Sequence, residues 1–159
     1  VSNKGLYKTA GKGSTNSACA DLSYTTFATD ASIESPANKV DSEAILGVNP
    51  QNIMIGGIYQ HVLYDELMST SEWSNNTAVK NGNVFKVPMG ISAWNRYGIE
   101  IAIMIPWTTA VVYQGIFDYD IVQETIDFYK EFSGYTLTEQ QAHYILEGLM
   151  PSGEKQIAN

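Results

Sequence analysis

The sequence predicts a single α/β domain, in which helices cover a short, mostly parallel sheet and the chain ends in two consecutive helices. Its 159 residues are 44% hydrophobic and 16% charged, which suits one domain with a core of its own. Short apolar segments alternate with helix-forming segments and are separated by glycine turns, an order that favours parallel strands. The C-terminal part carries two amphipathic patterns, each with a capping residue.

The first predicted unit is a strand, a glycine-rich turn and a helix, at residues 5–10, 11–15 and 16–22. Free backbone N–H groups at such a turn can hold an anion. A nucleotide- or phosphate-handling enzyme that uses this turn is therefore one hypothesis. The Walker motif fails, however, because Gly13 follows Lys12 where Ser or Thr is needed. Such an enzyme would bind nucleotide after Trp94→Ala and lose binding with a bulky residue at Gly13.

The second predicted unit repeats the alternation. Asp41 is a good N-cap, Asn49-Pro50 closes the helix that follows, and two glycines end the next strand. The expected segments are a helix at 42–46, a strand at 52–55, a helix at 59–68, irregular surface at 69–82 and a strand at 84–87.

The longest apolar run has an ambiguous pattern. Four isoleucines alternate with other residues between positions 99 and 105, which favours a strand by period and by β-branching. The apolar character continues to Val112, a length that suits a buried helix, which Pro106 would then kink. The run is too short to span a bilayer. The pattern alone leaves strand and helix open.

The C-terminal part predicts two helices. Asp120 with Gln123 resembles a capping box, and Gly134 is a stop signal for the helix between them. Thr138 with Gln141 repeats the capping pattern before the last helix. Residues 1–150 are expected to form the domain and residues 151–159 a tail.

Composition and motifs exclude several functions. The net charge is -8 and the basic residues are scattered, so nucleic acid is not expected as a partner. The single Cys19 and the absence of a Cys/His grouping argue against a metal site. The two histidines, His61 and His143, fall in predicted helices, where packing or capping is the simpler role. No nucleophile or metalloprotease motif is present, so neither an enzyme nor a cofactor is predicted.

One short segment carries chemistry suited to a ligand. Trp94 and Arg96 stand two residues apart in what looks like an exposed loop before the apolar run. A flat aromatic face and a fixed fork of donors can grip an anion or a planar organic group. A surface arginine beside a half-buried tryptophan is the alternative.

The order of several motifs resembles the C-terminal lobe of ABC-importer solute-binding proteins, the group that binds ferric siderophores, haem, cobalamin and related metal compounds or oxyanions. The matching segments are VDSEAIL at 40–46, NPQNIMIGG at 49–57, AVKNGNVF at 78–85, PMG at 88–90 and WNR at 94–96, with Trp73, Glu100, Trp107 and Phe128-Tyr129. The resemblance covers about residues 1–148. It implies a three-layer Rossmann-like lobe and a helix over residues 98–113, and it implies that a first lobe and a linking helix precede this chain.

The resemblance also implies roles for particular residues. Trp94 and Arg96 would face a cleft between two lobes, with Ser14, Thr15 and Tyr59 on the same rim as weaker candidates. Glu43 matches the position whose carboxylate, in the cobalamin system, pairs with arginines on the permease.

The implied function is capture of a small-molecule metal complex (siderophore, haem or cobalamin) or an oxyanion. The implied partner is the transmembrane permease of an ABC transporter. The location would be extracytoplasmic, in the periplasm or as a membrane-anchored lipoprotein on the cell surface. A noncatalytic interaction module is a further alternative.

Overall fold

The computed structural model describes residues 42–96 and 98–156. Along the chain the elements are α2 (Ser42–Val48), β1 (Ile53–Ile55), α3 (Gln60–Ser69), the 3-10 helix η1 (Ser71–Asn75), α4 (Thr77–Lys80), β2 (Val84–Lys86), α5 (Ile101–Val112), α6 (Ile121–Ser133) and α7 (Glu139–Leu146). The first predicted strand, turn and helix, together with Cys19 and Asp41, lie outside the described residues. The segments predicted from residue 42 onward as helices or strands are confirmed as to type.

The sheet of the described part consists of β1 and β2, which are parallel. Ile53 pairs with Val84, and Met54 pairs with Phe85. Because neighbouring side chains of a strand point to opposite faces, Ile53 and Val84 enter one core, whereas Met54 and Phe85 pack against another. Each face of the sheet is therefore covered.

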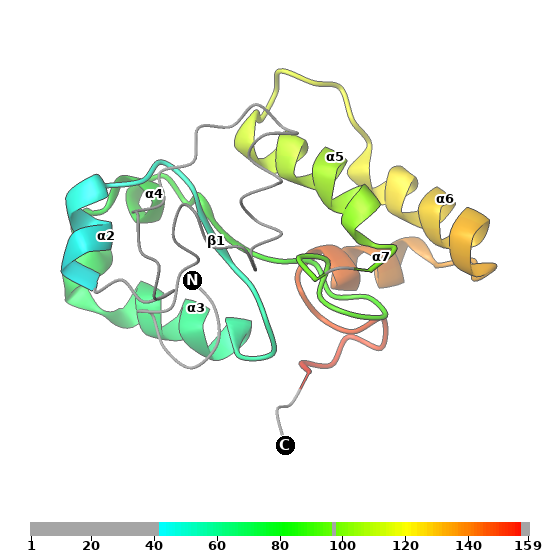
Figure 1. Cartoon of the computed structure of the whole chain (residues 1–159), viewed down its shortest axis with the longest axis horizontal. Helices are drawn as coiled ribbons and strands as arrows, with labels where there is room; N and C mark the ends of the chain where they lie inside the picture. The colour runs from blue at the N-terminus through cyan, green and yellow to red at the C-terminus, as the bar shows by residue number, and fades with distance from the viewer. Residues whose placement is uncertain (1–41, 97, 157–159) are drawn as a thin grey trace.

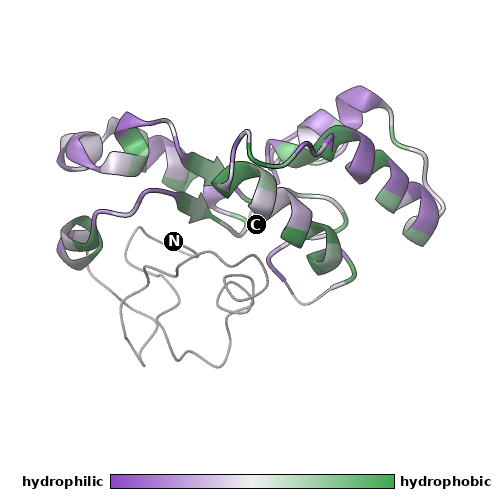
Figure 2. Cartoon of the chain, turned by 90° about the horizontal axis from the view of Figure 1, so that it is seen from above, coloured by the Kyte–Doolittle hydropathy of each residue, from purple (hydrophilic) through white to green (hydrophobic). Residues whose placement is uncertain are grey.

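Helices on the two faces complete three layers. α2 and α3 contribute Ile45, Leu63 and Leu67 to the first core. α5, α6 and α7 form the second core, where Trp107 meets Phe85 edge to face at 6.5 Å between ring centroids. Figure 1 shows these two groups of helices on either side of β1, and Figure 2 shows the apolar residues concentrated where the groups meet. The predicted layered α/β class is confirmed.

α5 settles the ambiguity of the long apolar run, because residues 101–112 are helical despite their alternating isoleucines. Ile103, Met104 and Trp107 are buried, and their spacing places them on one side of the helix. The long apolar run therefore forms a buried helix. Pro106 stands inside the helix and donates no backbone hydrogen bond. The helix implied by the resemblance is confirmed, whereas the kink stays a prediction. No described helix is long and apolar enough to cross a membrane.

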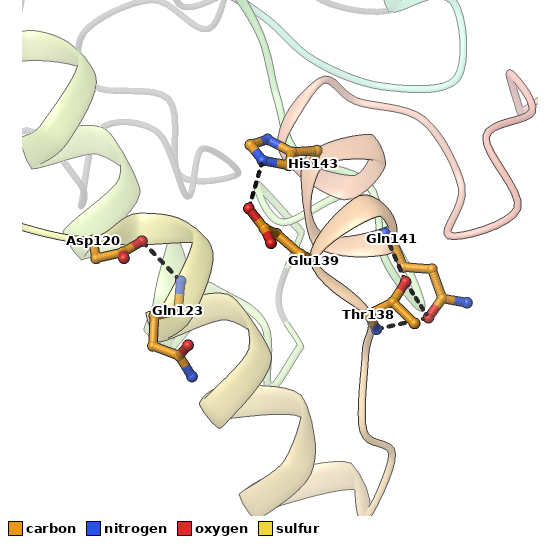
Figure 3. A network of polar contacts seen from close by, with 6 residues as sticks. All are labelled: Asp120, Gln123, Thr138, Glu139, Gln141 and His143. Carbon is orange, nitrogen blue, oxygen red and sulfur yellow. Dashed lines mark hydrogen bonds and ion pairs between the residues drawn. The ribbon is translucent and has the colours of Figure 1, made fainter.

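The predicted caps of the last two helices are present (Figure 3). The Asp120 carboxylate accepts the backbone N–H of Gln123 at 3.0 Å. Thr138 and Gln141 form a complete capping box. Gly134, with φ of +69°, ends α6 in the left-handed conformation. The Gln123 side chain does not return to its cap but donates to Asp127 at 3.0 Å, so the first box is only half formed.

One segment was predicted wrongly. Residues 69–82, expected as irregular surface, contain η1 and α4. Trp73 is only 1% exposed and belongs to the first core. The buried Asn76 caps α4 by accepting the N–H of Ala78. The polar composition of the segment gave no indication of these helices. One buried aromatic residue and one cap are enough to order a short segment that packs on a core.

Candidate functional site

Two loops meet at the carboxyl ends of the parallel strands. The first, residues 56–59, leaves β1 and enters α3, and the second, residues 87–96, leaves β2. In open α/β sheets, ligands bind in the crevice outside the carboxyl ends of the strands. The topology therefore points to this edge before any side chain is considered.

The two loops touch through Gly56 and Asn95. A Cβ placed on Gly56 would lie 2.5 Å from Nδ2 of Asn95 and 3.2 Å from Cγ2 of Val87. Only a glycine allows this approach. The Oδ1 atom of Asn95 is buried and accepts no hydrogen bond from the residues that the structure describes. The strand ends therefore have a buried acceptor without a donor in the described part of the chain, the Asn95 Oδ1 atom, directly beside them.

The second loop is closed on itself. The N–H of Trp94 donates to the Pro88 carbonyl at 3.1 Å, and the N–H of Arg96 donates to the Ala93 carbonyl at 2.9 Å. Met89 and Ala93 form an isolated antiparallel bridge. These short-range bonds give the loop a defined shape, so the position of Arg96 depends on how the loop is anchored below.

Glu100 forms that anchor. It precedes α5, is only 2% exposed, and accepts the backbone N–H groups of Ile91 at 2.8 Å and Ser92 at 2.9 Å. The Ser92 and Tyr129 hydroxyls also donate to it. A buried carboxylate is costly unless its oxygens receive hydrogen bonds, and here four donors supply them.

Tyr129 of α6 connects this anchor to Trp94. Its hydroxyl donates to Glu100 and accepts the indole N–H of Trp94 at 3.2 Å. Burial, followed by the hydrogen bond to Glu100, raises the pKa of Tyr129 well above its usual range. The phenol is therefore a permanent donor at neutral pH.

Trp94 and Arg96 occupy very different positions. Trp94 is 0% exposed and lies in the second core, so the expectation of an exposed ring is wrong. The cause is the polar partner that Tyr129 offers to the indole, which lets the whole ring be buried. Arg96, the only arginine of the chain, is exposed and forms no ion pair with any acidic residue of the described segments. The ligand roles predicted for both residues stay predictions.

Tyr59 lies where the first loop enters α3. It is partly buried against the first core and gives α3 no side-chain cap. The next two residues join α3 to the turn after α7, since Nε2 of Gln60 and Nε2 of His61 donate to the Gly148 carbonyl at 2.9 and 2.8 Å. Burial lowers the pKa of His61, although the bond to Gly148 opposes this. His61 is thus partly buried and bonded to the turn after α7, whereas the capping or packing role predicted from its helical position stays a prediction.

Three predicted residues remain. Ser14 and Thr15 lie outside the described residues. Glu43 is exposed in the first turn of α2, which is compatible with a docking role and with a favourable interaction with the helix dipole.

Two hollows lie near the described part of the second core. The larger, of about 370 Å³, is lined by Gly90, Ile91, Tyr129, Ser133, Tyr135, Leu137 and Pro151. The other, of about 210 Å³, is lined mainly by β2, α5 and the end of α7. Trp94, Arg96 and Tyr59 line neither. Within residues 42–96 and 98–156, no group of three or more His, Cys, Asp or Glu side chains could hold a metal ion.

Sequence reasoning missed the importance of Glu100, Tyr129 and Asn95. One signal was available: a glutamate inside an apolar run must find partners if the run is buried. Its donors come from positions 91, 92 and 129, and no spacing rule connects these positions.

Comparison with solved structures identifies proteins that have a similar fold. A periplasmic solute-binding protein from Veillonella parvula shares 26% identity over 87% of this chain and 43% of its own, with a TM-score of 0.67. The chain has the fold of one part of a periplasmic solute-binding protein. MolA of Haemophilus influenzae, a molybdate-binding protein of an ABC transporter solved with molybdate, shares 22% over 86% of this chain and 42% of its own, with a TM-score of 0.68.

An ABC-transporter solute-binding protein from Sulfurospirillum deleyianum shares 21% identity over 67% of this chain and 32% of its own, with a TM-score of 0.58. The chain thus spans less than half the length of these solute-binding proteins. No protein-family model matches the sequence, and no curated protein matches it significantly.

Proposed function

We propose that this chain forms one lobe of the solute-binding component of an ABC importer. The observation that carries the proposal is the meeting of two loops at the carboxyl ends of β1 and β2, within a fold shared with periplasmic solute-binding proteins. The proposed role is capture of a small molecule outside the cytoplasm and its delivery to a membrane permease.

The charges at this edge favour an anionic ligand. The guanidinium of Arg96 is exposed and without an ion pair among the described carboxylates, so it is available to a negative group. The nearby Glu100 carboxylate is already bound by four donors. We therefore favour an oxyanion, or a metal complex that carries carboxylate groups, as the ligand. The molybdate bound to MolA supports the first choice by fold similarity.

A second lobe would complete the site. The larger hollow reaches the second loop only at Gly90 and Ile91, and Tyr59, Asn95 and Arg96 line neither hollow. Ligand sites normally bury most of a small molecule. A lobe that covers Arg96 from the other side would supply this burial. The isolated chain should consequently bind weakly.

The decisive experiment titrates the longest natural protein that contains this sequence with molybdate, ferrichrome, haemin and cyanocobalamin, using calorimetry. We expect one of these probes to bind. Arg96→Ala should weaken an anionic ligand by roughly 2–5 kcal/mol if the charge pair is desolvated. Lys130→Ala, which removes an exposed cation on α6, is the matched control. If no probe binds, the proposed function fails. If a probe binds and Arg96→Ala leaves its affinity unchanged, Arg96 has no place in the ligand site.

Glu43 is the proposed docking residue for the permease. Its carboxylate is exposed in the first turn of α2, where a cationic partner can reach it. Glu43→Lys should reduce transport in cells or vesicles without changing ligand affinity. Glu139→Lys reverses a first-turn carboxylate whose side chain is 80% exposed on α7 and serves as the control. Equal transport by Glu43→Lys and the wild type would exclude docking through this residue.

A further inference from the structure

The loop that carries Arg96 is tied to two helices by a single buried network. Glu100 accepts two consecutive backbone N–H groups of the loop, those of Ile91 and Ser92. These two bonds hold the backbone of the loop, so they do not depend on which side chains stand at positions 91 and 92. A carboxylate has about four acceptor positions, and the hydroxyls of Ser92 and Tyr129 occupy the rest.

Tyr129 extends the network to the other end of the loop. Its hydroxyl lies between Glu100 and the indole N–H of Trp94, so one atom joins residues on α6, at the start of α5 and in the loop. Tyr129 is 4% exposed and Trp94 0%. Neither group can exchange these partners for water without local opening of the structure.

Gly90 shows how closely the loop lies on this network. A Cβ at this position would collide with the Tyr129 hydroxyl and with Oε1 of Glu100. The backbone of the loop therefore lies directly on the two side chains. A change in either one must be transmitted to the loop, because no intervening side chain can absorb it.

We propose that Glu100 and Tyr129 are positioning residues that hold residues 88–96 and thereby place Arg96 at the proposed ligand site. This inference rests on the proposed function as far as the ligand is concerned. Neither residue contacts the ligand. Glu100 acts through the backbone of Ile91 and Ser92. Tyr129 acts through Glu100 and through Trp94, two residues before Arg96.

The first test needs no ligand. Amide hydrogen exchange is measured on the wild type, Tyr129→Phe and Glu100→Gln, using the full chain. Exchange of the Ile91 and Ser92 amides should accelerate about tenfold in both variants, the size expected for the loss of one good hydrogen bond. Tyr135→Phe removes the hydroxyl of an exposed tyrosine that lines the same hollow as Tyr129 and should leave both amides unchanged. Unaltered exchange in Tyr129→Phe and Glu100→Gln would overturn the proposal.

The second test asks whether the effect reaches Arg96. In the longest natural protein containing this sequence, Tyr129→Phe should weaken binding of whichever probe binds, among molybdate, ferrichrome, haemin and cyanocobalamin, by about 3- to 10-fold. In an Arg96→Ala background the same change should have no further effect. Equal losses in both backgrounds would mean general destabilisation and would overturn the proposal. If no probe binds, the proposed function fails, and hydrogen exchange alone decides whether these residues hold the loop.

Discussion

Gly56 and Asn95 bring the two strand-end loops into contact, since a methyl group at Gly56 would lie 2.5 Å from Nδ2 of Asn95. The contact couples the end of β1 to the loop after β2. It also lies beside Oδ1 of Asn95, a buried acceptor without a donor among the described residues. The local shape of the edge therefore depends on the absence of one side chain.

Gly56→Ala tests this coupling. The added methyl group must displace Asn95 or Val87, and overpacking of this kind costs about 1–3 kcal/mol. We expect a lower free energy of unfolding in urea. Gly47→Ala in α2 is the matched control, because a Cβ there meets nothing within 4 Å and alanine should stabilise the helix by about 0.5–1 kcal/mol. Equal stabilities of the two variants would contradict the prediction.

Thr138→Ala removes one side of the capping box of α7. Oγ1 of Thr138 accepts the N–H of Gln141 at 3.2 Å, and Oε1 of Gln141 accepts the N–H of Thr138 at 2.9 Å. Loss of the cap should lower the free energy of unfolding by about 1 kcal/mol. Thr138→Ser keeps the hydroxyl and should remain close to the wild type. A Thr138→Ser variant as unstable as Thr138→Ala would show that the methyl group, and not the cap, is responsible.

His61 should make the protein less stable in acid. The pKa of His61 in the folded state is lowered below its ordinary value of 6.5. Once the pH falls below about 6.5, the unfolded state therefore binds more protons than the folded state. Stability is then full above about pH 6.5 and declines as the pH falls through the folded-state pKa. His61→Gln retains a donor for the Gly148 carbonyl and should flatten this decline in urea titrations between about pH 7.5 and 5. A decline in His61→Gln as steep as in the wild type would refute the assignment to His61.

Tyr129 has the opposite dependence, at alkaline pH. Its pKa is raised above 10.0 in the folded state, so the unfolded state loses its proton first and stability is lost as the pH rises beyond that value. At neutral pH, Tyr129→Phe should be less stable by about 1–3 kcal/mol, because Glu100 and Trp94 each lose a buried partner. The difference from the wild type should shrink in unfolding measurements above about pH 10. A constant difference would show that Tyr129 does not ionise on unfolding, and Tyr135→Phe controls for the loss of a hydroxyl.

Local signals in the sequence determined much of the fold. The hydrogen bonds of the Asp120 and Thr138 caps, and the stop at Gly134, depend on residues at most a few positions away, so a pattern can predict them. The strand types and their parallel order followed in the same way from short apolar segments between glycines. The resemblance implied a helix over residues 98–113, and the structure has a helix at residues 101–112. The pattern alone could not decide this, because the alternating isoleucines favour a strand whereas the apolar length favours a buried helix.

Tertiary structure alone decided the state of Trp94, the burial of Trp73 and the partners of Glu100. Trp94 is buried because a hydroxyl 35 positions away satisfies its N–H, and Glu100 is tolerated in the core because donors from the loop and from α6 surround it. Such pairings depend on distances in space between segments far apart in the chain. A sequence states which groups need partners, and only the packed structure states which groups supply them.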